Sequence, residues 1–240
     1  MVHSIDALEA SAQVATYLSD TYLDRIDTRV VAVGERDGAS WAAVERCLFH
    51  PQGGGQPADR GWLAGVEIVP LRDRESGLVV AVAAEGGTLP LLAEGQEVRA
   101  EIDLRARMTH AALHTAGHLI EAAGRMQGWE MLSNIHFPGQ ARIEFQLPQP
   151  DDRLAGPAGR EEATAALRTA VAAAIADDLA VFARYGSDGQ RVVHLGALHS
   201  APCGGTHVRS LRDLAEVTVP TLKVKKGRIR VSYSAAHRSL

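Results

Sequence analysis

The stretch LRARMTHAALHTAGHLIEAAGRM, residues 104–126, contains no proline and has the apolar spacing of an amphipathic helix. Its spaced apolar residues are Leu104, Met108, Ala112 and Leu119. Gly124 and Gly128 are expected to mark its end. The character of the chain changes at Asp103, so we expect two domains, residues 1–102 and residues 103–240.

The part before this helix is predicted to be mainly β-structure. Short β-prone runs alternate with glycine-rich turns and cover residues 28–34, 40–49, 61–70 and 78–84. Short strands at regular spacing predict a small barrel or a sandwich. The stretch before Tyr22 is expected to form a short helix or a lead-in strand.

The part after the helix mixes both kinds of element. A loop over residues 148–159 precedes an alanine-rich helix over 160–178. Strands are expected at residues 141–147, 179–184, 190–195, 214–219 and 221–233. Because helix and strand do not alternate regularly, this part is predicted to have an α+β fold.

Composition limits the class of protein. Hydrophobic residues make up 46% of the 240 residues and charged residues 22%, which is ordinary for a soluble globular protein. Residues 1–20 lack the basic and apolar regions of a signal peptide, and no apolar run approaches the roughly 20 residues of a membrane span. We therefore expect a cytoplasmic protein without membrane association, in which Cys47 and Cys203 stay reduced.

Net charge argues against a generally basic nucleic-acid binder, since the chain carries −4. Any RNA contact must come from a local patch, and one basic run lies near the C-terminus. Its members are Lys223, Lys225, Lys226, Arg228 and Arg230. The alternative is that this run is the solvated face of an edge strand. Arg107, with Asp103 and Arg105, is another candidate for RNA contact, or else part of a solvated helix start.

A metal site is indicated by two half-motifs. HTAGH places His114 and His118 one helical turn apart on one face, with His110 a turn earlier. Taken alone, the pair is more typical of packed or surface histidines than of a metal site. The second half, CGGTH, joins Cys203 to His207 through two glycines that allow a tight turn.

Three nitrogens and one sulfur suit one zinc ion better than calcium or magnesium, which take oxygen ligands. Four protein ligands are typical of a closed structural site, whereas catalysis needs an open position. HExxH and PCxxC are absent, which argues against zincin proteases and nucleobase deaminases.

A glycine-rich loop, HPQGGGQP at residues 50–57, interrupts the first part. It lacks the Gly-Lys-Ser/Thr of a phosphate-binding loop. Gly53, Gly54 and Gly55 allow close approach to a ligand, so we expect the loop to reach the metal site. A long hairpin turn is the alternative.

Several segments together resemble the alanyl-tRNA editing proteins of the AlaX family. That family is similar to the editing domain of alanyl-tRNA synthetase and to the second additional domain of threonyl-tRNA synthetase. In order, the segments are HPQGGGQPADRG (50–61), HTAGH (114–118), HFPGQARIEF (136–145), PCGGTH (202–207) and TLKVKKGRIRVSY (221–233).

The resemblance implies a β-barrel like those of translation factors, followed by an α+β editing domain that holds zinc. It implies the medium-length form of the family, which lacks an aminoacylation domain and acts in trans. The expected substrate is mischarged tRNA(Ala), either Ser-tRNA(Ala) or Gly-tRNA(Ala), whose ester is hydrolysed. No obligate protein partner is expected.

Functional residues follow from these motifs. His114, His118, Cys203 and His207 are the expected zinc ligands and catalytic centre, and Thr115 is placed to read a seryl hydroxyl unless it packs away from the site. Gln56 and Thr206 are further candidates for the surroundings of the site. The expected contacts to substrate or tRNA are Gly53, Gly54, Gly55, Gln56, Lys223, Lys225 and Lys226.

Two other functions fit the same residues. The quartet would also suit a structural zinc in a tRNA-binding module without hydrolysis, and its four protein ligands are the best support for this alternative. A metal-dependent esterase acting on a small molecule is the other possibility, although it would need no basic run.

Overall fold

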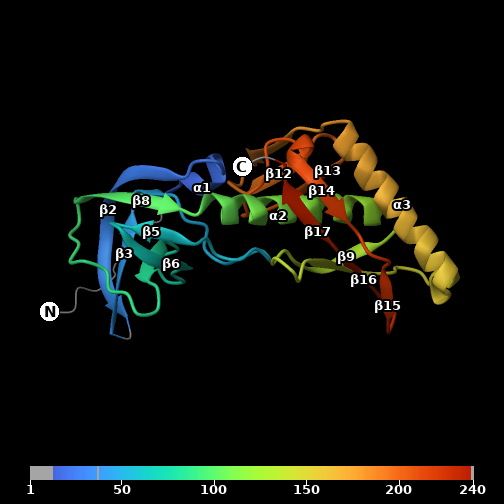
Figure 1. Ribbon diagram of the computed structural model, residues 1–240, viewed down its shortest axis with the longest axis horizontal. Helices are drawn as coiled ribbons and strands as arrows, with labels where there is room; N and C mark the ends of the chain where they lie inside the picture. Colours follow the sequence, from blue (N-terminus) through green and yellow to red (C-terminus); the bar gives the residue numbers. More distant parts are fainter. Residues whose placement is uncertain (1–12, 37, 239–240) are drawn as a thin grey trace. The chain divides into compact units, whose positions relative to one another are not determined.

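The computed structural model describes residues 13–36 and 38–238 (Figure 1). Most of the segment tested for a signal peptide therefore lies outside the described residues. Among those described, one compact unit takes in residues up to 53 together with 57–107, and the second takes in 54–56 and the residues from 108 onward. No described helix is both long and apolar enough to cross a membrane.

The first unit contains a closed antiparallel barrel, which decides between the barrel and the sandwich. Its strand order is β2-β3-β7-β6-β5-β8. The bounds are β2 Arg25–Arg36, β3 Ala39–Val44, β7 Val79–Ala83, β6 Val66–Arg72, β5 Gly61–Leu63 and β8 Glu97–Ile102. Before the barrel, β1 (Val14–Ala15) pairs in parallel with β4 (Arg46–Cys47), and α1 spans Thr16–Ser19.

Two strand predictions in this unit need correction. The single run predicted over residues 61–70 is a hairpin of β5 and β6, turned by Ala64 and Gly65 with φ of 50° and 80°. Two central residues with positive φ make the tight turn that matches strand twist. Strand β8 was not predicted, and it closes the barrel by pairing with both β2 and β5.

Arg107 is buried in the first unit, so neither sequence reading of it is correct. Its guanidinium is 0% exposed and pairs with Asp59, with the Nε atom donating to Asp59 Oδ1 at 2.8 Å. A second donor reaches the Leu48 carbonyl at 2.8 Å. A buried charge persists only when it is paired and hydrogen-bonded, so Arg107 is a structural anchor.

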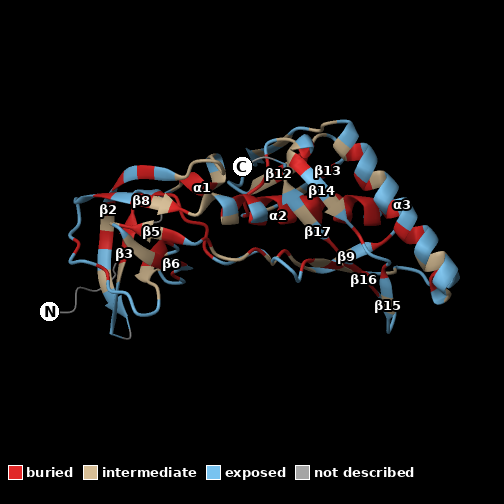
Figure 2. Cartoon of the chain, in the orientation of Figure 1, coloured by how far each residue is buried: buried red, intermediate tan, exposed pale blue. Residues whose placement is uncertain are grey.

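Helix α2, Leu104–Met126, spans the residues that the sequence predicts. Asp103 Oδ1 caps it by accepting from Ala106 N at 3.0 Å. Most of its length is buried (Figure 2). Gly128, with φ of 81°, takes the left-handed conformation after its end.

In the second unit, strands lie on both sides of α2 (Figure 1). One sheet has the order β15-β16-β10-β9, and another has the order β11-β12-β13. Their bounds are β9 Glu130–Ile135, β10 Arg142–Gln146, β15 Lys223–Lys225, β16 Arg228–Ser232, β11 Val181–Tyr185, β12 Arg191–Leu195 and β13 His199–Pro202. The mixture confirms the predicted α+β class.

The remaining elements refine the prediction. The long helix α3 spans Pro157–Ala176, three residues earlier at its start than predicted. Strand β14 (Leu214–Thr218) pairs with β17 (Ser234–His237), and short 3-10 turns occupy Asp152–Ala155 and Leu211–Asp213. Strands β9, β13 and β17 were not predicted, and the single strand expected over residues 221–233 is the β15–β16 hairpin.

Glycines inside α2 let the first sheet approach its backbone. A Cβ atom at Gly117 would lie 2.4 Å from His136 Cε1 and 2.7 Å from the Tyr233 hydroxyl. A Cβ atom at Gly124 would lie 2.6 Å from Phe145 Cζ. Glycine costs helix stability, and here it is needed for this close packing.

Candidate metal centre

Four side chains meet between α2 and the loop that follows β13. The atoms of His114, His118, Cys203 and His207 that could ligate a metal ion all lie within 4.8 Å of one another. Cys203 Sγ is 3.4 Å from His114 Nε2 and 3.2 Å from His207 Nε2. The fold therefore brings both sequence half-motifs together. Three imidazoles and a thiol at this spacing form a donor set suited to zinc.

His114 is held by the end of the glycine-rich loop. Its Nδ1 lies 2.8 Å from Gln56 Oε1, which also accepts from Thr206 N at 3.0 Å. Gln56 Nε2 in turn donates to Thr206 Oγ1 at 2.9 Å, so the orientation of the amide is determined. A carbonyl oxygen can only accept, hence His114 Nδ1 carries the proton and its Nε2 keeps the lone pair that a metal needs.

His207 is held in the same way by Thr115. The Thr115 hydroxyl lies 3.1 Å from His207 Nδ1 and accepts from Val208 N at 3.3 Å. Thr115 is fully buried, and its hydroxyl meets the imidazole at Nδ1, whereas Nε2 is the nitrogen that lies near Cys203. This geometry gives Thr115 a positioning role for His207.

His118 is supported by two residues that the sequence motifs do not include. Its Nδ1 lies 3.2 Å from His199 Nε2 and 3.6 Å from Glu121 Oε2. Arg125 donates to the other oxygen of Glu121 at 2.6 Å. Burial lowers the pKa of His118, but hydrogen bonds to Cys203 and Glu121 outweigh burial and raise it to about 9.

The loop that carries Cys203 is shaped by contacts to its backbone. Arg191 donates to the carbonyls of Cys203 at 2.7 Å and Gly205 at 3.2 Å. Gly205 N donates to Cys203 Sγ at 3.3 Å. A Cβ atom at Gly205 would lie 2.1 Å from His114 Cε1, whereas one at Gly204 would meet nothing within 4 Å. Only the second glycine is required by packing.

The quartet is accessible on one side. His114, His118 and His207 are buried, but Cys203 is half-buried and its neighbours Pro202 and Gly204 are exposed. Cys203 is therefore the most exposed residue of the quartet.

The glycine-rich loop divides into two parts. Gly53 and Gly54 are exposed, whereas Gln56 is 0% exposed beneath His114. Gly55 accepts from His136 N at 2.8 Å, and with φ of 77° it has no room for a side chain beside Asn134. The end of the loop thus reaches the quartet, and Gly55 is the glycine that close packing requires there.

His136 is the functional candidate that the sequence motifs missed. Its ring stacks on His114 with centroids 4.3 Å apart, and its Nδ1 lies 2.5 Å from the Tyr233 hydroxyl. Burial, followed by the charge of His118, lowers the pKa of His136 to about 3, so the ring is neutral. The segment HFPGQARIEF contains this residue, but a lone histidine before a strand carries no distinctive signal.

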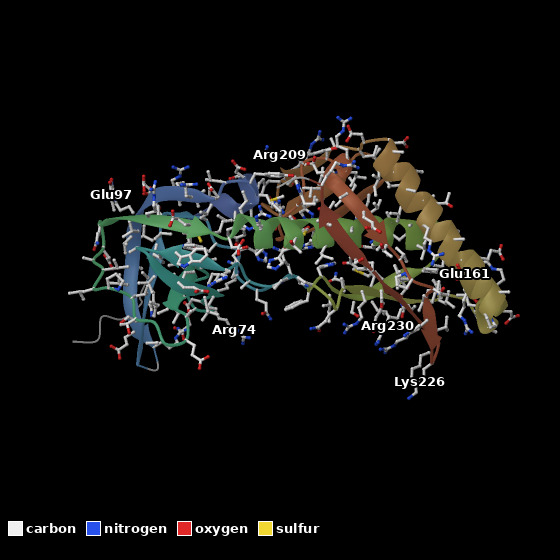
Figure 3. All side chains as sticks on the ribbon, viewed as in Figure 1. Arg74, Glu97, Glu161, Arg209, Lys226 and Arg230 are labelled. Carbon is white, nitrogen blue, oxygen red and sulfur yellow. The ribbon has the colours of Figure 1, made fainter. Side chains whose placement is uncertain are left out.

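The basic run forms one face of the β15–β16 hairpin. Lys223 faces Arg230 and Lys225 faces Arg228, and a groove of about 520 Å³ runs along them with Glu144 at its side. Lys226 and Gly227 turn the hairpin with φ of 51° and 73°. Figure 3 labels Lys226 and Arg230 on it. Glu144 pairs with Arg230 at 2.7 Å and with Arg142 at 3.8 Å, and the five cations that line the groove outnumber this one carboxylate.

Comparison with known proteins points to one group. The chain is 25% identical over 93% of its length to the alanyl-tRNA editing protein AlaX-L of Pyrococcus horikoshii, and 26% identical over 84% of its length to AlaX-M of the same organism. The chain resembles the alanyl-tRNA editing proteins. No protein-family model matches it.

Coverage of these relatives is uneven. The match covers 58% of AlaX-L and 87% of AlaX-M. An alanine–tRNA ligase of Frankia casuarinae is 30% identical over 84% of the chain, but the match covers only 26% of that enzyme. The similarity to editing proteins therefore extends over most of the chain, whereas only a part of the ligase is represented.

Proposed function

We propose that the chain is a zinc-dependent hydrolase that acts in trans on mischarged tRNA(Ala), releasing serine or glycine. The observation that supports this best is the quartet itself. Two of its imidazole Nε2 atoms lie within 3.4 Å of one thiol, and each imidazole is braced through Nδ1. The relatives named as alanyl-tRNA editing proteins supply the class of reaction.

The residues fit one zinc ion, which His114, His118, Cys203 and His207 would hold. Zinc ligands are usually held in place by further hydrogen bonds, as these imidazoles and this sulfur are. When bound, zinc supplies either activation of water at neutral pH or a positive charge that holds the amino acid. The chain's own groups orient the ligands. The ester approaches from the side of Cys203, because this ligand is only half-buried.

There is a physical reason for a hydrolytic site that acts after the aminoacylation site has selected its amino acid. A pocket distinguishes small amino acids poorly, because one methylene is worth only about 1–3 kcal/mol and an added hydroxyl is weakly rejected. The RNA is bound through its phosphates, and the β15–β16 hairpin offers five cationic side chains for that purpose.

A deacylation assay tests the proposal. Zinc-loaded protein is expected to release serine from Ser-tRNA(Ala), to release glycine from Gly-tRNA(Ala), and to spare Ala-tRNA(Ala). If the protein hydrolysed none of these substrates, the proposal of an editing enzyme would be contradicted. Binding of zinc and tRNA without turnover would favour the structural-zinc module.

The two cysteines provide a matched pair of variants. Cys203→Ala is expected to lose zinc and deacylation together, because it removes the sulfur ligand. Cys47→Ala removes a buried thiol of the barrel and is expected to keep both. Metal content by mass spectrometry and initial rates measure the outcome, and full zinc stoichiometry in Cys203→Ala would remove this residue from the ligand set.

A further inference from the structure

The outer face of the barrel carries one aromatic side chain in a row of small and apolar residues. The row crosses β2, β3, β7 and β6, and each member is the register partner of the next: Gly34, Trp41, Val82 and Val69. Register partners in antiparallel strands share a face of the sheet, and successive side chains along a strand alternate between faces. Ala81, which precedes Val82, lies in the barrel core, so the row faces outward. Val69 is 42% exposed on it.

The indole of Trp41 is held in place by Gly34. A Cβ atom at Gly34 would lie 2.5 Å from Trp41 Cζ2 and 2.7 Å from Cε2, so the ring lies against this part of the backbone. Trp41 is nevertheless only half-buried, and it lines two grooves of about 450 and 750 Å³. The ring is therefore fixed against the sheet and remains accessible from the grooves.

The larger groove combines this ring with positive charge. Its volume falls within the range of about 300–1,000 Å³ that is typical of ligand sites. Its charged side chains are three arginines and one aspartate, Arg36, Arg72, Arg74 and Asp73. The groove is thus locally cationic in a chain whose net charge is −4.

Asp73 cancels only part of this charge. Its Oδ1 atom accepts from Arg36 at 2.8 Å. Its Oδ2 atom accepts from Ser76 N at 2.9 Å and from the Ser76 hydroxyl at 2.7 Å. Both carboxylate oxygens are therefore occupied by other partners than Arg72 and Arg74.

Arg72 and Arg74 keep their charge for a ligand. Arg72 donates to the Gly77 carbonyl and to the Tyr17 hydroxyl at 3.0 Å each, and neither of these neutral acceptors cancels its charge. Arg74 is exposed, and within the part of the chain that the structure describes it forms no ion pair (Figure 3). The groove therefore offers two guanidinium groups and one flat aromatic ring.

We propose that this groove binds an unpaired nucleotide of the RNA substrate, with its base stacked on Trp41 and its phosphates at Arg72 and Arg74. The inference rests on the proposed function, because it concerns the RNA part of the same substrate. Single strands bind in this way, since an unpaired base has a free π-face and its phosphates need cations. A duplex would not suit the ring, because its bases already stack on one another. A second copy of the chain, or an apolar peptide, would leave the guanidinium groups without anions.

Binding of short RNA to the full chain tests the inference. The probes are a fluorescein-labelled single-stranded oligoadenylate and an RNA duplex of the same length, both followed by fluorescence anisotropy. Trp41→Leu is expected to weaken binding of the single strand about tenfold to a hundredfold, the usual effect of losing one stacking platform. Trp41→Phe keeps an aromatic ring and is expected to retain most of the affinity. Arg74→Gln is expected to make the slope of log K against log salt concentration shallower by about 0.7.

Trp62→Leu is the matched control, because Trp62 is a half-buried barrel residue outside the groove, with the Arg60 guanidinium 5.4 Å from its ring. It is expected to leave affinity unchanged. Equal affinities of Trp41→Leu and the unaltered protein would overturn the inference, and so would tighter binding of the duplex. Loss of a dimer in Trp41→Leu, with RNA affinity unchanged, would assign the face to a second copy instead. Binding is measured without turnover, so a failure of deacylation contradicts the proposed function separately.

Discussion

At the scale of residues, the quartet depends on the groups behind it. Gln56, Thr115 and His199 each occupy the Nδ1 atom of one imidazole, and they come from a loop, a helix and a strand. The sequence places Gln56 and Thr115 near the site. It does not show whether they contact the substrate or hold the metal ligands in place. Their complete burial favours support, because a fully buried side chain meets neighbours before it meets a substrate.

Gly205→Ala tests how tightly these ligands are held. The added Cβ atom would lie 2.1 Å from His114 Cε1 and 2.8 Å from Gln56 Oε1, so the ring must move. Zinc affinity is expected to fall about tenfold to a hundredfold, as for other changes behind a metal ligand. Competition with a chromophoric chelator measures it. Gly204→Ala, where the added atom meets nothing within 4 Å, is the control, and equal affinities in the two variants would contradict the geometry.

At the scale of elements, α2 and the β15–β16 hairpin have different tasks. The helix is almost wholly buried and fixes two of the ligands. The hairpin buries Ile229 and Val231 on one face and turns its cations outward on the other. The edge-strand alternative for the basic run holds for Lys223 and Lys225, because β15 ends the sheet, but not for Arg228 and Arg230, because β16 lies between β15 and β10. An edge position does not exclude RNA binding on the same face.

Neutralising the hairpin is expected to weaken tRNA binding. Replacing Lys223, Lys225 and Lys226 by Gln removes three cations and keeps side-chain length. The slope of log K against log salt concentration should become shallower by about 2 to 3, since each phosphate contact contributes roughly 0.7–0.9. Filter binding over a salt series measures it, with Arg29, Arg46 and Arg99, exposed residues of the first unit, changed to Gln as control. An unchanged slope would place the RNA contact elsewhere.

At the scale of the whole molecule, each compact unit has its own polar anchor. In the first unit, the buried pair Arg107–Asp59 ties the first turn of α2 to the segment that follows the glycine-rich loop. Asp59 also accepts from His50 N at 2.5 Å. In the second unit, Gln56 connects His114 to the loop at Thr206. The two ends of one short stretch, residues 56–59, therefore serve different units.

Asp59→Asn is expected to lower the free energy of unfolding by about 3 kcal/mol or more, because it leaves a buried guanidinium unpaired. Urea unfolding followed by tryptophan fluorescence measures this change. Asp27→Asn is the matched control, since its partner Arg99 and Asp27 itself are 52% and 71% exposed. Such a surface pair is worth about 1 kcal/mol or less. Equal losses in the two variants would show that burial does not set the strength of the Arg107 pair.

Prediction from sequence succeeded where the signal was local. Helix α2 was predicted because its apolar spacing is continuous and free of proline, and HTAGH and CGGTH were visible as ligand pairs. Arg107 was misjudged because its polar type hides its burial. His199 and Glu121 were missed because neither lies inside a ligand motif, although Glu121 shares a helix face with His118.

The sequence by itself determined the donor types, their spacing within each half-motif and the mixed class of the fold, since these depend on residues close in the chain. Only the tertiary structure decided how the two half-motifs meet, because His114 and Cys203 are 89 residues apart. It also decided barrel closure, which depends on β8 pairing with two other strands. The stacking of His136 on His114 likewise depends on the tertiary structure, because one ring belongs to α2 and the other to the segment that follows β9.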